Sequence, residues 1–414
     1  MISVDGLMPE TIRTAEANGL RLPNLIEMRD GGAFAAGLVG VFPTVTYPSH
    51  TAMVTGVRPS EHGIFGNQLF DPENKSKGAW FAYTEQIRVP TLWDAARAAG
   101  KSVGAVSWPV TVGAQIDFNI PEFYPPSSED LVMLQRAVST PGVFAAFEKE
   151  HGAVQVGSSP DDAFRAAQAS FLLKTYKPEF LLLHLIDLDH EQHGFGVGSP
   201  EAKHALEGID RAIGEVRKTV KAIGLESETR WLIVSDHGFW PVTQAFQPKA
   251  FLNSLGLAAP EGKLSEWRVA AHINGGSVAF VSKDSNDRDA QQLVKAALQS
   301  LQGDPRWGID KVLDRAQLDK LKAYPLAFAA VSLSRGFTNG SESTGPWVRS
   351  TATRGMHGYL PGPAELDCTF IAFGPGISAR KIPRAELVDV AKTAAGLLGV
   401  EMPQAGGKNL LAKP

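Results

Sequence analysis

The feature of this sequence that most constrains its fold is a repeated alternation between short apolar runs and amphipathic helical patterns. The runs, such as FLLLHLI and WLIV, are hydrophobic along almost their whole length instead of alternating with polar residues. Strands of this kind are buried on both faces, which is typical of a mainly parallel sheet covered by helices. The expected strands are 1–4, 37–42, 102–107, 180–186 and 231–235, and the expected helices are 11–18, 22–30, 91–99, 161–174 and 202–222. The sequence therefore predicts a three-layer α/β/α sandwich.

The pattern changes between about residues 240 and 350. Strand-like and helical segments there predict a small α+β lobe, at 277–282, 289–301, 310–321 and 327–334. Segments 368–373 and 384–398 then return to the earlier rhythm of strand followed by helix. We therefore predict a core of residues 1–240 and 350–414 with an inserted lobe of residues 241–349.

Composition excludes several classes of protein. The net charge of −4 over 414 residues gives the chain no general attraction for nucleic acid or an anionic membrane, so an anionic substrate would need local positive charge. The single cysteine, Cys368, excludes an internal disulfide framework, and its apolar surroundings predict a buried structural thiol. No stretch approaches the roughly 20 apolar residues of a transmembrane helix.

The beginning of the chain reads as the end of a buried strand. Residues 1–4 are shorter than the about 5–6 residues usual for such a strand. We expect upstream residues to be missing, with an export signal among them, and hence a periplasmic or secreted location.

Acidic and imidazole side chains follow several of the predicted strands. Ligands of parallel α/β sheets bind beyond the carboxyl ends of the strands, which is where these side chains should meet. Carboxylate oxygen and imidazole nitrogen together are typical ligands of Zn²⁺. The candidate ligands are Asp5, Asp189, His193, Asp236, His237 and His357.

Each fragment also has an ordinary structural interpretation. The Asp236-His237-Gly triplet can be a turn whose Asp caps a helix, and His193 alone can be a solvated loop residue. Thr46, in the segment FPTVTYPSHTAMVTG, is predicted to start a helix, where free N–H groups and a positive dipole end gather. Its hydroxyl can be a nucleophile if a metal or base activates it, or merely an N-cap.

Taken together and in order, these motifs resemble the nucleotide pyrophosphatase/phosphodiesterase branch of the alkaline phosphatase superfamily. The resemblance lies in VDGL, PTVTYPSH, VTGVRPSEHGIFGN, PTLWDAARAAGKSVGAVSWP, the DxxxH spacing of Asp189 and His193, SDHG, GMHGY and FIAFGPG. It covers residues 1 to about 240 and about 350 to 414. It implies an alkaline phosphatase-like sandwich and two divalent metal ions, with Zn²⁺ the first expectation and Mn²⁺ also compatible with the ligands.

The resemblance also implies a role for each matching residue. One metal would be held by Asp189, His193 and His357, and the other by Asp5, Asp236 and His237. Thr46 would attack phosphorus and form a phospho-threonine intermediate, and Asn67, 21 residues later, would donate to a phosphate oxygen. The implied reaction is hydrolysis of phosphodiester or nucleotide pyrophosphate bonds in a small-molecule substrate.

Departures from the family pattern concern the substrate pocket rather than the metals. Ser49 stands where Asn is frequent, WPVTVG replaces Trp-Pro-Gly, and His184 is the nearest match to an aromatic residue before the DxxxH pair. Tyr47 and His184 are the predicted substrate-binding side chains, although Tyr47 can also be a wall aromatic.

Other functions remain open from the sequence. The same site could hydrolyse phosphomonoesters or phosphonates, if a further cation such as Arg58, Lys101 or Arg354 met the extra negative charge. A binding or receptor protein and a phosphomutase are more distant alternatives. The remaining histidines are interpreted as structural or solvent-exposed: His50, His62, His151, His190, His204 and His272. The sequence predicts no oligomeric state.

Overall fold

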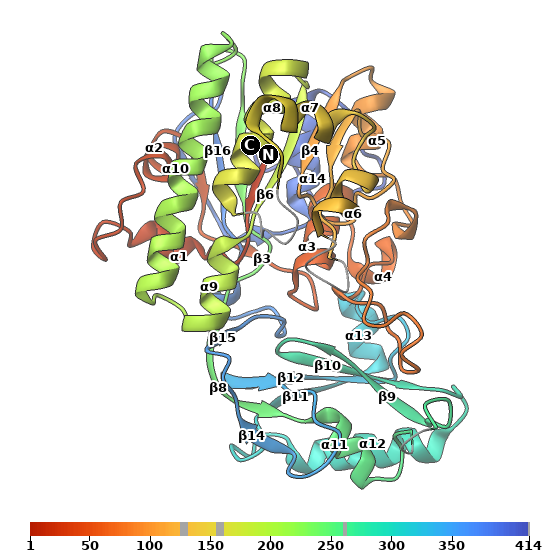
Figure 1. Cartoon of the computed structure of the whole chain (residues 1–414). Helices are drawn as coiled ribbons and strands as arrows, with labels where there is room; N and C mark the ends of the chain where they lie inside the picture. Colours follow the sequence, from red (N-terminus) through yellow and green to blue (C-terminus); the bar gives the residue numbers. More distant parts are fainter. Residues whose placement is uncertain (125–130, 155–160, 260–262, 413–414) are drawn as a thin grey trace.

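The main element of the fold is an eight-stranded sheet. The computed structural model describes residues 1–124, 131–154, 161–259 and 263–412. Across the sheet, the strands are β17 (Arg380–Ile382), β2 (Ala33–Ala35), β16 (Phe370–Phe373), β7 (Trp231–Val234), β1 (Ile2–Val4), β6 (Phe180–Leu185), β4 (Val103–Val106) and β5 (Phe118–Ile120) (Figure 1). Strands β7, β1, β6, β4 and β5 run parallel to one another, and β16 runs antiparallel to both of its neighbours.

Helices cover both faces of this sheet. One hydrophobic core unites the sheet with α3 (Thr46–Thr55), α5 (Leu92–Ala98) and α14 (Asp389–Leu398). A second core unites it with α1 (Pro9–Arg13), α2 (Pro23–Gly31), α6 (Leu131–Val138), α7 (Val143–His151), α8 (Asp162–Tyr176), α9 (Asp187–Phe195) and α10 (Pro200–Ala222). Neighbouring residues Ala105 and Val106 of β4 belong to opposite cores, so the strand is buried on both faces. The predicted three-layer sandwich is confirmed.

The longest helix shows how local signals set an element's bounds. The Ser199 side chain accepts a hydrogen bond from the Ala202 backbone N–H at 3.1 Å, and Pro200 occupies the first helical position of α10. The apolar side chains of α10 then pack against α8 and the sheet. Within the described residues, the structure has no helix with the length and apolar character needed to span a membrane.

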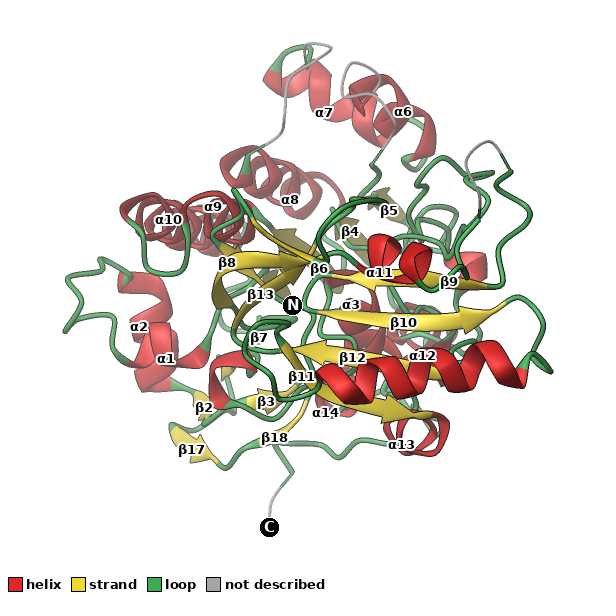
Figure 2. Ribbon diagram, turned by 90° about the horizontal axis from the view of Figure 1, so that it is seen from below, coloured by secondary structure: helices red, strands yellow, loops and turns green. Residues whose placement is uncertain are grey.

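Residues from β8 to β15 form two further sheets outside the main one (Figure 1). One is antiparallel, in the order β11 (Ile309–Asp314), β12 (Ala329–Leu333), β10 (Ser277–Ser282), β9 (Val269–Asn274). In the other, β8 (Trp240–Phe246) pairs with β13 (Gly336–Asn339), β14 (Val348–Ser350) and β15 (Gly355–Met356). Helices α11 (Pro248–Ser254), α12 (Arg288–Leu301) and α13 (Arg315–Leu321) accompany these sheets, and Figure 2 shows α12 lying along the antiparallel one.

The predicted bounds of the lobe, 241–349, remain a prediction. Strand β8 begins at Trp240 and pairs with β15, whose residues lie beyond 349, so β-pairing crosses both predicted boundaries. The prediction of a mixed α+β character agrees with the elements found there.

Three expected elements were wrong in their bounds. The helix expected at 384–398 begins only at Asp389, the first residue of α14. The strand expected at 37–42 is β3 (Leu38–Val39), which pairs with β18 (Ala385–Glu386) and bridges Cys368 through Leu38, while residues 33–35 form the sheet strand β2 instead. The helix expected at 11–18 ends at Arg13, because the Thr14 hydroxyl bonds back to the Glu10 carbonyl and the chain then turns. The remaining short elements are α4 (Pro59–His62), η1 (Thr84–Gln86) and η3 (Ala364–Leu366). Cys368 is fully buried, as predicted.

Candidate metal centre

The parallel strands end at one edge of the main sheet, and the predicted ligands lie there. Asp5 directly follows β1, and its N–H donates to the Leu185 carbonyl at the end of β6. Asp236 and His237 follow β7, and all three side chains are buried. Helix α9 follows β6 and carries Asp189 and, one turn later, His193.

Two glycines allow the segments to approach closely. Gly6 has a φ of +69°, and its N–H donates to Asp236 Oδ1 at 3.1 Å; a Cβ there would lie 2.7 Å from the ring of Phe239. Gly355 brings β15 against α9, where a Cβ would lie 2.5 Å from the carbonyl oxygen of Gln192. A side chain at either position would force the site apart.

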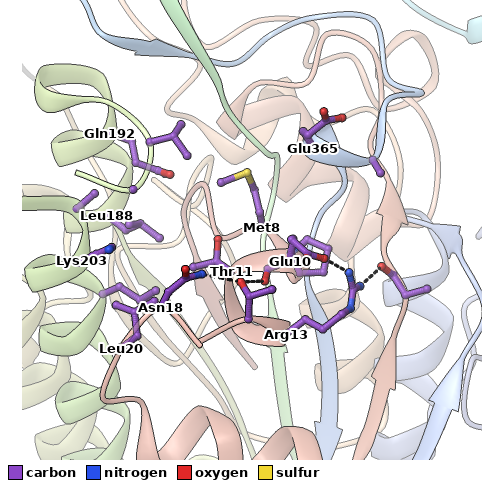
Figure 3. Close-up of a pocket in the computed structure, with 18 residues that line it drawn as sticks. Met8, Glu10, Thr11, Arg13, Asn18, Leu20, Leu188, Gln192, Lys203 and Glu365 are labelled. Atoms are coloured by element: carbon purple, nitrogen blue, oxygen red, sulfur yellow. Dashed lines mark hydrogen bonds and ion pairs between the residues drawn. The ribbon is translucent and has the colours of Figure 1, made fainter. Parts of the chain in front are cut away.

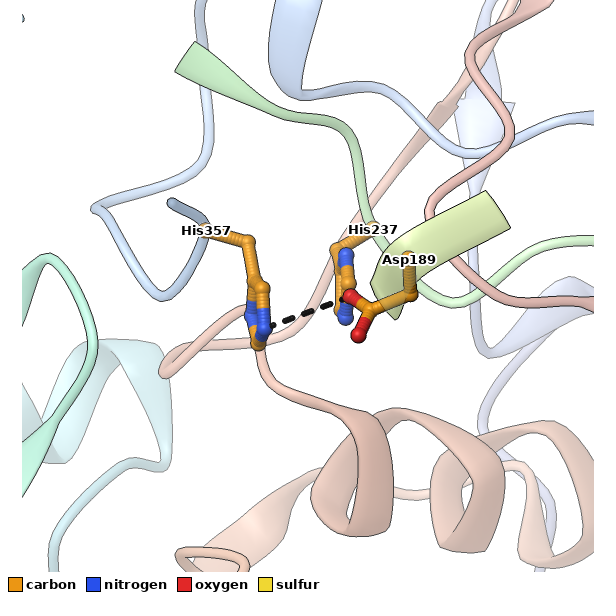
Figure 4. Close-up of side chains that lie close together, drawn as sticks. All are labelled: Asp189, His237 and His357. Atoms are coloured by element: carbon orange, nitrogen blue, oxygen red, sulfur yellow. Dashed lines mark ion pairs between the residues drawn. The ribbon is translucent and has the colours of Figure 1, made fainter. Parts of the chain in front are cut away.

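Two groups of side chains could each hold a metal ion. One contains Asp189, His237 and His357 (Figure 4), and the other contains Asp5, Asp236 and His237; within each, the potential ligand atoms lie within 4.8 Å of one another. His237 Nε2 is 3.2 Å from both Asp5 Oδ1 and Asp236 Oδ2. His357 Nε2 is 3.7 Å from Asp189 Oδ1, and its ring stacks on that of His237 at 3.6 Å.

His193 lies beside the first group. Its Nε2 is 3.4 Å from Asp189 Oδ2, and its ring centroid is 5.1 Å from that of His357. His193 Nδ1 donates to the Gly355 carbonyl at 2.9 Å, and His357 Nδ1 donates to the Thr44 carbonyl at 3.1 Å. Each bond directs the remaining Nε2 lone pair toward the acidic side chains, which is the usual orientation of a metal-binding histidine.

The donor set fits a divalent cation. The two groups and His193 together form a cluster of candidate ligands. Several buried atoms of this cluster have no hydrogen-bond partner among the described residues: Asp5 Oδ1, Asp189 Oδ1, Asp236 Oδ2, His237 Nδ1 and His237 Nε2. Buried carboxylate oxygens are costly when unpaired. A cation would satisfy them, and the mixture of oxygen and nitrogen donors suits zinc.

Burial shifts the pKa values of these groups in the direction that favours a bound cation. Burial, followed by the charges of Asp236 and Asp189, raises the pKa of Asp5 well above its usual value, and burial raises the pKa of Asp236 to about 7. Burial lowers the pKa of His357 to about 4 and that of His237 well below its usual value. The imidazoles are therefore neutral, as ligands must be, while the carboxylates repel one another until positive charge is added.

Thr46 is the first residue of α3, and Val45 occupies the N-cap position. The alternative that Thr46 merely caps the helix is therefore wrong. Asn67 Nδ2 lies 3.5 Å from Thr46 Oγ1, while Asn67 Oδ1 accepts a bond from the Tyr47 N–H at 2.9 Å. Two backbone carbonyls of this segment accept hydrogen bonds from nearby histidines. The Thr44 carbonyl accepts from His357, and the Thr46 carbonyl accepts from His50.

The two predicted substrate-binding side chains lie deeper than expected. His184 is fully buried on β6, with Nε2 3.1 Å from Asp5 Oδ2 and Nδ1 2.8 Å from Glu122 Oε2. Burial alone would lower the pKa of His184, but the charges of Glu122 and Asp5 outweigh it and raise the pKa to about 10. Tyr47 is also fully buried, with its ring 5.1 Å from that of Trp80. Both ring nitrogens of His184 are already bonded to carboxylates, and the position of Tyr47 agrees with the wall interpretation, so substrate binding by these two side chains stays a prediction.

Sequence reasoning missed two residues of the site. Glu122 follows β5 at the same edge of the sheet, so a carboxylate after an apolar strand was the available signal. His50, interpreted as structural, lies with Nδ1 2.8 Å from the Thr46 carbonyl oxygen and 3.7 Å from Asp236 Oδ2. Its position one helical turn after Thr46 could have indicated this.

The other histidines agree with their interpretation as structural or exposed. His62 and His272 are buried away from the cluster, and His151, His190 and His204 are exposed. A separate cavity of about 370 Å³ is lined by α1, α9 and α10 residues, including Leu188 and Gln192 (Figure 3). None of the ten predicted catalytic, ligand or substrate side chains, or of the two missed residues, lines it within the part of the chain that the structure describes.

Comparison with known proteins gives this site its context. Ectonucleotide pyrophosphatase/phosphodiesterase family member 1 of Homo sapiens is 24% identical over 91% of the chain and 37% of its own length. The venom phosphodiesterase of Naja atra is 23% identical over 58% of the chain and 26% of its own length. The chain thus spans less than half the length of these relatives.

A solved structure and a family match complete the comparison. Human ectonucleotide pyrophosphatase / phosphodiesterase 5 superposes with a TM-score of 0.70 at 19% identity, covering 99% of this chain and 97% of that one. The predicted alkaline phosphatase-like sandwich is therefore confirmed. The type I phosphodiesterase / nucleotide pyrophosphatase family matches residues 1–360. Because this match covers most of the sequence, the chain belongs to the type I phosphodiesterase / nucleotide pyrophosphatase family.

Proposed function

We propose that the chain hydrolyses phosphodiester or nucleotide pyrophosphate bonds, with Thr46 as nucleophile and two divalent metal ions as cofactors. The observation that carries this proposal is the Thr46 hydroxyl at the start of α3, 3.5 Å from Asn67 Nδ2 and on the segment that orients His357. The names of the relatives, which include pyrophosphatases and phosphodiesterases, support the same reaction class.

Six side chains would hold the metals. We propose Asp189, His193 and His357 for one ion and Asp5, Asp236 and His237 for the other, with His237 also close to the first set. When bound, the cations would lower the pKa of the threonine hydroxyl and neutralise negative charge on the phosphoryl group. Zn²⁺ is the first candidate, since both nitrogen and oxygen ligands are present.

The protein's own side chains account for the remaining chemistry. Thr46 Oγ1 would attack phosphorus, one alcohol or phosphate group of the substrate would leave, and a phospho-threonine that still carries the second substituent would remain until water releases it as the monoester product. Water would then hydrolyse that ester and regenerate the hydroxyl. The amide N–H of Asn67, already directed at Thr46 Oγ1, would donate to a phosphoryl oxygen as its negative charge grows.

Diesters are favoured over monoesters by the available cations. A monoester carries more negative charge and would need a free cationic side chain near the site. Arg58 is paired with Glu386 at 2.8 Å and Lys101 with Glu179 at 3.4 Å, so two of the three candidates are already engaged. Arg354, whose backbone N–H donates to the His193 carbonyl, is the candidate for the alternative phosphomonoesterase or phosphonate hydrolase activity.

The test compares bis(p-nitrophenyl) phosphate with p-nitrophenyl phosphate before and after chelation, with Zn²⁺ restored. We expect Zn-dependent activity that prefers the diester by at least about tenfold and is lost in Thr46→Ala, because only the hydroxyl can form the covalent intermediate. Thr55→Ala is the matched control: it removes another buried hydroxyl from α3, one bonded to the Thr51 carbonyl.

Three results would change the proposal. A strong preference for the monoester would favour the phosphatase alternative. Full activity of Thr46→Ala would exclude Thr46 as nucleophile. No turnover of either compound by Zn-loaded protein would contradict hydrolysis of simple phosphate esters.

A further inference from the structure

Three buried side chains form a row behind the metal centre: Glu122, His184 and Asp5. His184 is the middle member, with Nδ1 2.8 Å from Glu122 Oε2 and Nε2 3.1 Å from Asp5 Oδ2. His184 is fully buried, and Glu122 is only 5% exposed. Since carboxylate oxygens accept hydrogen bonds, both ring nitrogens of His184 donate.

The two carboxylate oxygens of Asp5 have different neighbours. Oδ2 accepts the bond from His184, while Oδ1 points to the other side, 3.2 Å from His237 Nε2, and has no hydrogen-bond partner among the described residues. His184 therefore fixes the rotation of the carboxylate. One oxygen is directed at the candidate metal ligands, and the other is held away from them.

Fold stability gives little reason to keep such a row. Bringing charged groups into the interior is unfavourable, and apolar replacements are often as stable. Glu122 follows β5 and Asp5 follows β1, two strands that are not neighbours in the sheet, and His184 on β6 joins them. Outer partners of this type orient metal ligands in other proteins, where their loss typically costs 10–100-fold in metal affinity.

We propose that Glu122 and His184 are positioning residues, which hold Asp5 so that only Oδ1 is free for a divalent cation. Glu122 acts through His184 and has no contact with substrate. The inference rests on the proposed function to the extent that Asp5 is a metal ligand. It adds two residues to that site and assigns them an effect on one of the two metal ions.

The test is a Zn²⁺ titration of the full chelated chain, followed by calorimetry, for the wild type and Glu122→Gln. Glutamine keeps the shape of the side chain but removes its charge. We expect the Kd of one zinc equivalent to rise about 10–100-fold and the other to stay within about threefold.

Asp210→Asn is the matched control. Asp210 is a fully buried carboxylate on α10 that accepts bonds from the backbone N–H groups of Asn24 and Leu25. Its isosteric replacement should lower the Tm and leave both zinc affinities unchanged. A purely structural role of Glu122 would give the same pattern, so unchanged zinc binding by Glu122→Gln would overturn the proposal.

A second variant covers failure of the first to fold. His184→Gln removes the ring that bonds Glu122 and Asp5 at the same time, so we expect it to weaken one zinc equivalent as well. If neither variant folds, the row maintains the fold instead of positioning Asp5, and the proposal is wrong.

The titration also separates this proposal from the proposed function. Wild-type protein that binds two zinc ions but hydrolyses no phosphate ester would contradict the reaction and leave the effect of Glu122→Gln to decide the positioning role. Wild-type protein that binds neither Zn²⁺ nor Mn²⁺ would contradict both proposals.

Discussion

Two buried histidines in different regions of the molecule share almost every local property. His357 lies at the edge of the main sheet, and His272 lies on β9 in the smaller antiparallel sheet. Each is 6% exposed, and burial lowers the pKa of each to about 4. Each also has one ring nitrogen 3.1 Å from a backbone carbonyl oxygen, that of Thr44 for His357 and that of Gln68 for His272.

The surroundings of the two rings differ. His357 stacks on His237 and faces Asp189, whereas the ring centroid of His272 lies 5.6 Å from that of Phe70 and 6.3 Å from that of Tyr324. A buried neutral histidine is thus not by itself a metal ligand. The two sites differ in their neighbours. Carboxylates with unsatisfied oxygens lie beside His357, whereas aromatic rings surround His272.

The largest expected difference between His357 and His272 is the effect of their removal on hydrolytic activity. His357→Ala should lower the rate of diester hydrolysis by at least about 10³-fold if His357 is a ligand as proposed, because losing a ligand costs more than the 10–100-fold typical of outer partners. His272→Ala removes the same ring and should stay within about threefold of wild type. Both rates are measured with saturating Zn²⁺ at a temperature well below the Tm of each variant. An equal loss of activity in His272→Ala would contradict the distinction drawn between His357 and His272.

The strand-end positions of the candidate ligands could be predicted from sequence because these positions are local. Asp5, Asp236 and His237 each follow an apolar run directly, and parallel strands bring such ends to one edge. Asp189 and His193 are one helical turn apart, which also fixes their relation. The fold class followed from the same runs.

The remaining parts depend on contacts between distant segments. Glu122 and His184 are 62 residues apart in the sequence, and no periodic pattern predicts that they form a hydrogen bond. The same holds for the bond from His272 to the Gln68 carbonyl, which joins the smaller sheet to the loop containing Asn67. Strand β2 was missed because its three residues, AFA, are too short to give a clear pattern, and their strand character comes from pairing with β16.

A smaller effect should appear in the pH dependence of stability. An unfolded chain binds a proton at His272 near pH 6.5, whereas the folded protein binds it only near pH 4. The unfolded state therefore holds more protons between these values, and stability is lost as the pH falls from about 6.5 to 4. The difference corresponds to roughly 3 kcal/mol.

Urea unfolding of chelated wild type and His272→Ala at pH 7.5 and pH 4 measures this effect. Wild type should lose roughly 3 kcal/mol more than the variant on acidification, since other titrating groups are common to both. Equal losses would show that His272 is protonated in the folded state, and its environment would then resemble that of a solvated histidine.

The smallest expected effect compares two buried tyrosines, one beside each histidine. The Tyr324 hydroxyl lies 2.8 Å from Ser277 Oγ, and the Tyr359 hydroxyl donates to the Phe337 carbonyl at 2.6 Å. Replacing either by Phe keeps the ring and removes one hydrogen bond, so each should lower the free energy of unfolding by about 1 kcal/mol.

Zinc affinity should then distinguish the two tyrosine variants. Tyr359 is two residues from His357, and its carbonyl accepts the hydroxyl of Thr44, the residue whose own carbonyl holds that histidine. Loosening Tyr359 should therefore weaken zinc binding a few-fold. Tyr324→Phe should leave zinc binding unchanged because the Tyr324 ring packs on Phe42 and His272, neither of which is a candidate ligand. Calorimetric titration of the two variants decides the point. Equal zinc affinities of the two variants would mean that Thr44 and the carboxylates alone set the position of His357. The difference between His357 and His272 would then depend only on the side chains that contact each imidazole.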